Sequence, residues 1–139
     1  MTIDPITDEV VALLARIVDR FVDSYESAAA AQGLTTVQAK VLQALDEPLP
    51  MHRIAEKLNS ERSNVTGIID RLEARGLVER RADQRDRRIK NIVATPAGAV
   101  LGRNFRRSLG FAAEPLAALD PADRVQLRDL LTRMVDVEA

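Results

Sequence analysis

The sequence predicts a mostly α-helical protein with a small β-hairpin, arranged as a winged helix-turn-helix plus a helical dimerisation region. Three observations support this fold class. The 139-residue chain contains three Phe, one Tyr and no Trp, so its core must be built from aliphatic side chains, which favours packed helices over a β-sandwich. Residues 53–95 show two short helices, a strand, an arginine-rich turn and a second strand. The segments on either side carry apolar residues at helical spacing.

The first helix is expected to begin at Thr7 or Asp8, which can both accept hydrogen bonds from free backbone N–H groups, and to end at Gly33, the residue suited to a left-handed cap. Its apolar residues form two neighbouring stripes, which a small chain cannot cover alone, so we expect a homodimer. The stripes consist of Val10, Leu14, Ile17, Phe21 and Tyr25, and of Val11, Val18 and Val22.

Two shorter helices follow. Thr35 and Gln38 form a Thr-x-x-Gln capping box at the start of the first, which must stop before Pro48. The second is expected from about Pro50 to Leu58. The side chains predicted to be buried are Val37, Val41, Leu42 and Leu45 in the first of these helices, and Ile54, Ala55 and Leu58 in the second.

The fourth predicted helix is expected to be capped by Ser60 and to end at Gly76. Val65, Ile68, Ile69 and Leu72 share its buried side. The small and hydrogen-bonding residues opposite would let it enter a DNA major groove about 12 Å wide. Gly67 is unfavourable in mid-helix by ~1 kcal/mol, which fits a close approach to a ligand, although a plain surface glycine fits as well. The candidate DNA-contacting residues on this helix are Arg62, Ser63, Asn64, Thr66, Gly67 and Arg71.

Residues 77–81 and 89–94 are predicted to form the two strands of a hairpin, joined by the turn ADQRDRR. An isolated charge run is usually a solvated loop. Directly after a helix-turn-helix pattern, however, long arginine side chains at a hairpin tip suit a narrow, electronegative minor groove. The candidate DNA-contacting residues of this turn are therefore Arg85, Asp86, Arg87 and Arg88.

Two helices are predicted after the hairpin. Thr95, followed by a proline, caps the first, which is expected to run past Leu109 and Phe111 to a break at or before Pro115. Asp120, also followed by a proline, starts the last helix. Its apolar residues make it amphipathic: Val125, Leu127, Leu130, Leu131, Met134 and Val137.

The charges are segregated along the chain. The net charge is −1, yet residues 71–107 carry eleven basic and four acidic side chains, a net charge of +7, which leaves −8 for the remainder. This partition is expected when one face approaches a nucleic acid and the others repel it. We therefore expect residues 34–95 to be the DNA-binding domain, and residues 1–33 and 96–139 to be the dimerisation region.

Several functional classes are disfavoured by composition. The chain has no cysteine and a single histidine, so we expect no thiolate or multi-histidine metal site and no cofactor. No nucleophile–base pair, phosphate loop or metal-ligand spacing is present, which argues against an enzyme. The N-terminus lacks a basic leader, and no apolar run reaches the ~20 residues of a membrane span. A cytoplasmic location is the expectation.

Three short motifs resemble those of the MarR (multiple antibiotic resistance regulator) family of transcription factors. They are Asp86-x-Arg88, the Asp70–Glu73 segment leading to Gly76-Leu77-Val78, and Thr95-Pro96-x-Gly98. The resemblance implies a homodimer on a pseudo-palindromic DNA operator. It places Ser63, Asn64, Thr66 and Gly67 on the recognition helix and Arg88 at the wing position that enters the minor groove, oriented by Asp86. Many family members have arginine where this chain has Gly67.

Members of this family commonly release DNA when a small molecule binds, such as an aromatic acid, a phenol or a drug-like compound, so the resemblance leaves two expectations for this chain: a small-molecule effector, or no effector at all. The candidate ligand residues are Arg16, Phe21, Tyr25, His52, Phe105 and Arg106, although aromatic residues at helical spacing more often belong to a core. An alternative function is a winged-helix module for protein interactions, in which the charged wing is merely solvated. The basic bias of residues 71–107 favours DNA.

Overall fold

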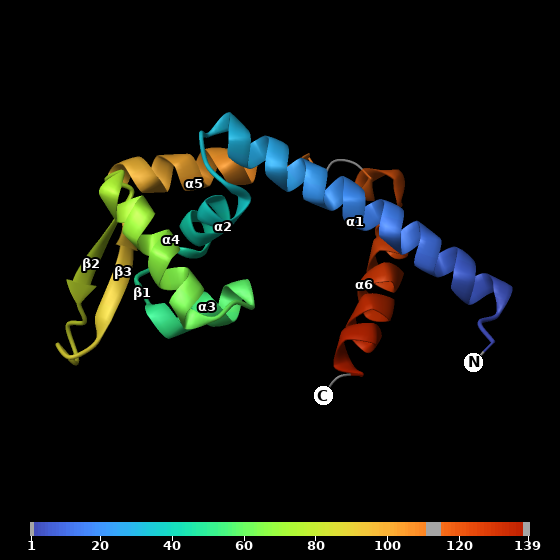
Figure 1. The fold of residues 1–139 in the computed structure, drawn as a ribbon. Helices are drawn as coiled ribbons and strands as arrows, with labels where there is room; N and C mark the ends of the chain where they lie inside the picture. The colour runs from blue at the N-terminus through green and yellow to red at the C-terminus, as the bar shows by residue number, and fades with distance from the viewer. Residues whose placement is uncertain (1, 111–114, 138–139) are drawn as a thin grey trace. The chain divides into compact units, whose positions relative to one another are not determined.

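The computed structural model describes residues 2–110 and 115–137. Contacts group residues 22–109 into one compact unit and the described residues before and after it into a second unit. The elements, labelled in Figure 1, are α1 (Pro5–Ala31), α2 (Thr36–Ala44), β1 (Leu49–Pro50), α3 (Met51–Leu58), α4 (Arg62–Ala74), β2 (Val78–Ala82), β3 (Lys90–Ala94), α5 (Pro96–Ser108), the 3-10 turn η2 (Leu116–Ala118) and α6 (Pro121–Asp136). The fold class predicted from the sequence is confirmed.

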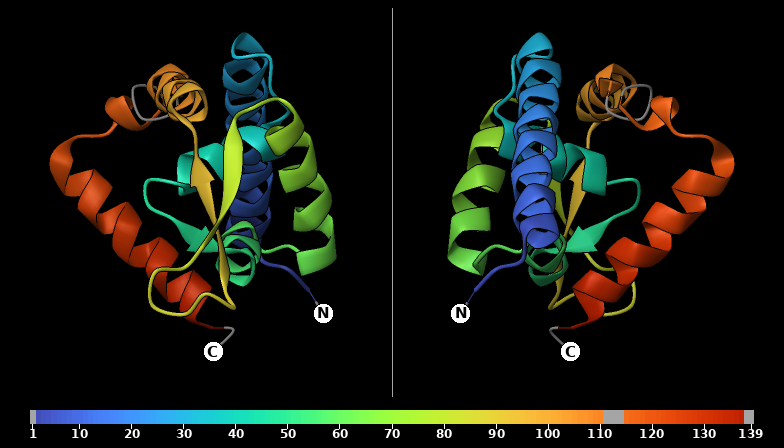
Figure 2. Two further views of the ribbon diagram at one scale, coloured as in Figure 1. Left: turned by 90° about the vertical axis from the view of Figure 1, so that its left-hand side faces the viewer. Right: turned by 90° about the vertical axis from the view of Figure 1, so that its right-hand side faces the viewer.

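The sheet has three antiparallel strands in the order β1-β3-β2 (Figure 2). The hairpin of β2 and β3 matches the predicted one to within a residue and pairs from Val78 opposite Ala94 to Ala82 opposite Lys90. The two-residue strand β1, which places Leu49 opposite Ile92, was not predicted from the sequence. Two residues are too few for an alternating pattern, so this strand left no periodic signal.

The core of the unit formed by residues 22–109 is aliphatic, as the composition required. Its one fully buried aromatic side chain among the described residues is Phe105, which meets the ring of Tyr25 edge-on at 5.5 Å between centroids. The predicted core positions Val41, Leu42 and Ile54 are buried, but Val37 is 43% exposed. Ala39 takes the inward position on α2 instead. The most buried large side chains are Phe105, Ile54, Ile69, Leu72, Ile92, Val41, Val65 and Val78.

Most predicted helix ends are confirmed by their capping bonds. The backbone N–H of Gln38 donates to the Thr35 hydroxyl and the Thr35 N–H donates to the side-chain Oε1 of Gln38, both at 3.1 Å. Gly33 has a φ of +67°, the left-handed conformation expected after α1. Thr95 and Asp120 cap α5 and α6 through their side chains.

Three predicted helix ends were wrong. Asp4 rather than Thr7 caps α1, because its carboxylate accepts hydrogen bonds from both the backbone N–H and the hydroxyl of Thr7. Ser60 does not cap α4. Asn59 adopts a left-handed conformation that closes α3, and Ser60 belongs to this closing turn. Helix α4 therefore starts after Glu61 without a side-chain cap. Finally, α5 ends at Ser108, before Leu109. Phe111 lies outside the described residues.

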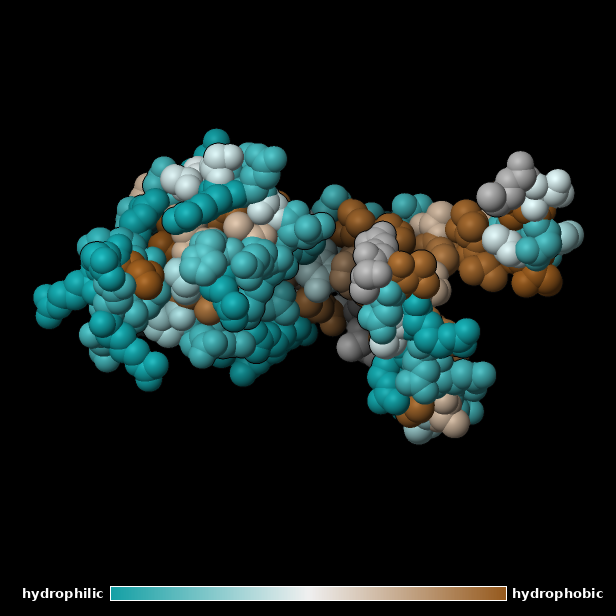
Figure 3. Space-filling view, turned by 90° about the horizontal axis from the view of Figure 1, so that it is seen from below, coloured by the Kyte–Doolittle hydropathy of each residue, from teal (hydrophilic) through white to brown (hydrophobic). Residues whose placement is uncertain are grey.

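The unit formed by the chain's two ends exposes many apolar side chains, shown along the N-terminal part of α1 in Figure 3. On α1 they are Ile6, Val10, Val11, Leu13, Leu14, Ile17, Val18 and Phe21, and on α6 they are Val125, Leu130, Leu131, Met134 and Val135. None of the helices in residues 2–110 and 115–137 has the length and hydrophobicity needed to cross a membrane.

Candidate nucleic-acid interface

The outer face of α4 is exposed along its full length, because the opposite face is anchored by Val65, Ile69 and Leu72 with no accessible surface. The structure thus separates the buried and exposed sides of this helix as the sequence predicted. The exposed residues are Arg62, Ser63, Asn64, Thr66, Gly67, Asp70 and Arg71. A Cβ added at Gly67 would meet no atom within 4 Å, so no intramolecular contact requires a glycine at this position.

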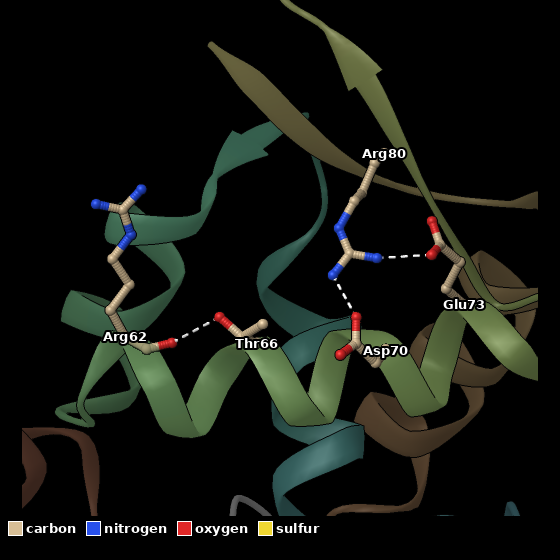
Figure 4. A network of polar contacts seen from close by, with 5 residues as sticks. All are labelled: Arg62, Thr66, Asp70, Glu73 and Arg80. Atoms are coloured by element: carbon tan, nitrogen blue, oxygen red, sulfur yellow. Dashed lines mark hydrogen bonds and ion pairs between the residues drawn. The ribbon is translucent and has the colours of Figure 1, made fainter.

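Hydrogen bonding restricts what Thr66 offers to a ligand. Its hydroxyl donates to the Arg62 carbonyl oxygen, one turn earlier, at 3.0 Å (Figure 4). A hydroxyl has a single proton, so toward solvent Thr66 presents oxygen lone pairs and a methyl group. The Arg62 guanidinium extends away from the helix in Figure 4.

The loop between β2 and β3 holds an aspartate–arginine pair. Arg88 donates to the Asp86 carboxylate from Nε at 3.0 Å and from Nη2 at 3.1 Å, and its backbone N–H donates to the same carboxylate at 3.1 Å. The side-chain hydrogen bond from Arg88, followed by the backbone one, lowers the pKa of Asp86, and the same pair raises the pKa of Arg88. The predicted orientation of Arg88 by Asp86 is therefore present, while the Arg88 side chain remains 91% exposed.

A second ion-pair network, which was not predicted from the sequence, joins the hairpin to α4. Arg80 on β2 donates from Nη2 to Asp70 Oδ1 at 2.5 Å and from Nη1 to Glu73 Oε1 at 2.6 Å (Figure 4). The hydrogen bond that Arg80 donates to Asp70 is the main cause of the raised pKa of Arg80. A signal was available in the sequence: Arg80 has the same strand parity as buried Val78, and Asp70 and Glu73 share a helix face.

The candidate effector residues are divided between the two units. Phe105 is buried against Tyr25. Arg106 is held by Asp46, with a shortest distance of 3.0 Å, and also donates to the Gln43 carbonyl. The two remaining candidates on α1, Arg16 and Phe21, belong to the unit formed by the chain's ends, and His52 lies at a hollow beside the turn between α3 and α4.

A different hollow, of about 320 Å³, lies between α1, α2 and α3. Tyr25 forms part of its wall, and the Lys40 ammonium lies 5.0 Å from the centre of the Tyr25 ring. Lys57 from the end of α3 is a second cation in the lining, which is completed by Gln43, Ala44 and Leu58. Across residues 2–110 and 115–137, no group of three or more acidic, His or Cys side chains is placed to hold a metal ion.

Comparison with known proteins agrees with this geometry. The model of the MarR family matches residues 34–90, which run from the start of the helix-turn-helix to the beginning of β3. A similar solved structure is that of BpsR from Bordetella bronchiseptica, whose DNA binding is described as regulated by 6-hydroxynicotinic acid. It is 28% identical to this chain, the match covers 97% of this chain and 99% of BpsR, and the TM-score is 0.73. Residues 34–90 of the chain form a MarR-family domain.

Two curated transcription regulators also match this chain. The transcriptional repressor NicR of Pseudomonas putida is 27% identical over 134 residues, which cover 94% of this chain and 85% of NicR. The transcriptional activatory protein BadR of Rhodopseudomonas palustris is 40% identical over 73 residues, which cover 49% of this chain and only 42% of BadR.

Proposed function

We propose that this MarR-family chain is a transcriptional repressor that binds a pseudo-palindromic DNA operator as a homodimer and is released by a small aromatic acid. The observation that carries the proposal is the pairing of an exposed, polar α4 face with a hairpin loop that holds Arg88 extended on Asp86. A helix and a loop of these types fit a major groove and the adjacent minor groove.

We assign base contacts to Ser63, Asn64, Thr66 and Gly67. Asparagine can form two hydrogen bonds to adenine. Because the Thr66 proton is used by the Arg62 carbonyl, Thr66 is limited to accepting from an amino group of cytosine or adenine or to contacting a thymine methyl. The arginines assigned to phosphates are Arg62, Arg71, Arg85 and Arg87, and Arg88 is assigned to the minor groove.

The wing assignment is tested by substituting Arg88→Ala. Loss of a good groove contact should weaken operator affinity by about tenfold or more, since such contacts contribute ~1–3 kcal/mol. Stability should hardly change, because the Arg88 side chain is exposed. The matched control is Arg128→Ala on α6, which also removes an exposed arginine paired with a nearby aspartate. Equal affinities of the two variants in a gel-shift titration would refute the wing assignment.

Salt dependence separates DNA recognition from the alternative of a protein-interaction module. Arginines that neutralise phosphates release counterions, so the affinity for DNA should fall steeply as salt is raised. A flat salt dependence would favour the protein-interaction function.

The homodimer is supported by the exposed apolar faces of α1 and α6 described above. Patches of this extent are rarely left open to water and often mark a subunit interface. A dimer also fixes the span between two α4 helices, which must match half-sites one helical turn, ~34–36 Å, apart. Ile17→Glu should yield a monomer by light scattering and abolish operator binding. A variant that stays dimeric would place the interface elsewhere.

Repression is favoured over activation because the match to NicR extends over 94% of this chain, whereas the match to BadR covers 49%. A reporter driven by the operator should be more active without the regulator than with it. Lower activity without the regulator would identify an activator.

The proposed effector site is the hollow lined by Tyr25, Lys40 and Lys57. Its volume of about 320 Å³ suits a single-ring compound, and two lysine ammonium groups beside an aromatic ring suit a carboxylate on that ring. We expect hydroxybenzoates or 6-hydroxynicotinic acid to release the operator, and Lys40→Met to lower ligand affinity in calorimetry. Unchanged binding in that variant would exclude this hollow.

A further inference from the structure

We infer that Arg80 is a positioning residue that fixes the hairpin against α4, so that Asp70 and Glu73 strengthen specific DNA binding although both are acidic. The inference rests on the proposed DNA-binding function, in which α4 and the hairpin loop contact one operator together. It concerns three residues outside the assigned DNA contacts.

Geometry supports this role. Arg80 bridges from β2 to two carboxylates on neighbouring turns of α4, using a different terminal nitrogen for each (Figure 4). Its guanidinium is planar and rigid, so two simultaneous bonds fix both a direction and a distance between the elements. The Arg80 side chain is only 29% exposed, whereas that of Asp70 is 61% exposed. The arginine is thus the more enclosed partner.

Arg80 lies far enough along the hairpin for its ion pairs to restrict the movement of the loop. Backbone pairing joins β2 and β3 through five residue pairs, so the hairpin moves as one body. Its base is tied to the end of α4, where the Thr95 hydroxyl donates to the Gly76 carbonyl at 2.7 Å. Arg80 adds a second tie farther toward the loop, opposite Ile92. Two separated ties stop a hairpin from pivoting about its base.

A direct phosphate contact by Arg80 is the competing account, and it makes the opposite prediction. If Arg80 bound DNA directly, removing its two carboxylate partners would free its charge and remove two negative charges from the interface, so binding would tighten. If Arg80 positions the hairpin, the same change loosens the hairpin and weakens specific binding. The sign of the effect therefore decides between the two.

The test uses the double variant Asp70→Asn with Glu73→Gln in the full chain. A duplex is first selected by the wild-type protein from a randomised pool, and affinities are then measured for this duplex and for scrambled DNA. We expect about a fivefold to fiftyfold loss on the selected duplex, which lies within the range of couplings in one ion-pair network, and no loss on scrambled DNA. Arg80→Lys, which keeps the charge but cannot hold both carboxylates as a fork, should show the same pattern.

The matched control is Glu79→Gln. Glu79 is also paired with an arginine, since Arg81 Nη2 lies 2.6 Å from its carboxylate, but both residues are on β2 and the pair links no two elements. This control should bind DNA at least as tightly as the wild type. Circular dichroism and thermal melts establish that each variant is folded at the assay temperature.

A second measurement needs no DNA. Because the chain has no cysteine, spin labels can be attached specifically at Ser63→Cys on α4 and Gln84→Cys in the loop, in protein diluted with unlabelled chain. The distance distribution should be broader in the Asp70→Asn and Glu73→Gln background than in the Glu79→Gln background. An unchanged width would overturn the positioning role.

The outcomes separate the inference from the function on which it rests. Failure of the wild type to select any duplex would refute the proposed function, and the spin-label widths would still decide whether Arg80 fixes the hairpin. A selected duplex that the double variant binds as tightly as, or more tightly than, the Glu79→Gln control would overturn the inference and leave the DNA-binding function standing.

Discussion

Gly98 is the position where the structure predicts the largest effect of adding one methyl group. A Cβ at Gly98 would lie 1.9 Å from the Leu77 carbonyl oxygen, 2.9 Å from the Leu77 carbonyl carbon and 3.3 Å from Leu42 Cδ2. Two of these three atoms belong to the backbone, so no rotamer change relieves the clash. In Gly98→Ala the first turn of α5 must move away from the residue that precedes β2.

The cost exceeds the usual gain from replacing a helical glycine. Alanine is better than glycine within a helix by ~1 kcal/mol. Overpacking typically costs about 1–3 kcal/mol, and the cost is greater where only backbone can yield. The same movement strains two hydrogen bonds at this junction, from the Thr95 N–H to the Leu77 carbonyl at 3.1 Å and from the Gly98 N–H to the Thr95 hydroxyl at 3.1 Å. We expect a net destabilisation of about 2 kcal/mol or more.

Urea unfolding followed by circular dichroism measures this, at one protein concentration because dimerisation contributes to stability. Gly67→Ala is the control, since its added methyl meets no atom within 4 Å. It should stabilise the protein by about 0.5–1 kcal/mol. Gly102→Ala, 3.2 Å from the Leu42 carbonyl oxygen, should fall between the two. A Gly98→Ala protein as stable as the wild type would refute the reasoning.

Three further predictions concern α4, α2 and the loop. Although Gly67→Ala should raise stability, it should weaken operator binding if the helix approaches DNA closely at this position; unchanged binding in a gel shift would identify a plain surface glycine. Thr35→Ala removes the hydroxyl that accepts from the Gln38 N–H and should cost about 0.5–2 kcal/mol in urea unfolding, with a smaller loss for Gln38→Ala, which removes only the acceptor of the Thr35 N–H. Because Arg88 lowers the pKa of Asp86 below its ordinary 3.8, the pair should persist above that value and be lost only as the pH falls through the lowered pKa. A carbon NMR titration should therefore show Asp86 titrating below 3.8 in the wild type and closer to 3.8 in Arg88→Ala, and a higher wild-type midpoint would contradict this.

Local signals predicted most of the fold. Capping at Thr35, Thr95 and Asp120 involves residues three apart, and the buried face of α4 follows from helical spacing, so each is readable within a few residues. The missed cap at Asp4 had the same Asp-Pro signal that located α6 correctly. The sequence therefore contained the signal for a cap at Asp4, although the helix start was predicted later, at Thr7 or Asp8.

Features that depend on tertiary contact were not readable in this way. The strand β1 exists because β3 offers an edge to Leu49, and the exposure of Val37 depends on where neighbouring elements end. The bridge from Arg80 to Asp70 joins residues ten apart on different elements. The alternation along β2 places Arg80 on the same side as buried Val78, but it does not show whether the partner of this arginine is a phosphate or a carboxylate of the same chain.

The arginines of the candidate interface differ in whether a carboxylate of the same chain already binds them. Within residues 2–110 and 115–137, Arg62, Arg71, Arg85 and Arg87 form no ion pair and are exposed, so their charges remain available to phosphates. Both terminal nitrogens of Arg80 donate to carboxylates. These contacts reduce the attraction of Arg80 to DNA and fix the hairpin against α4. Arg88 is intermediate, because one carboxylate orients it while its side chain stays exposed. The net charge of +7 over residues 71–107 already counts Glu73 and Asp86, so the ion pairs do not change this total; they determine which arginines remain available to DNA.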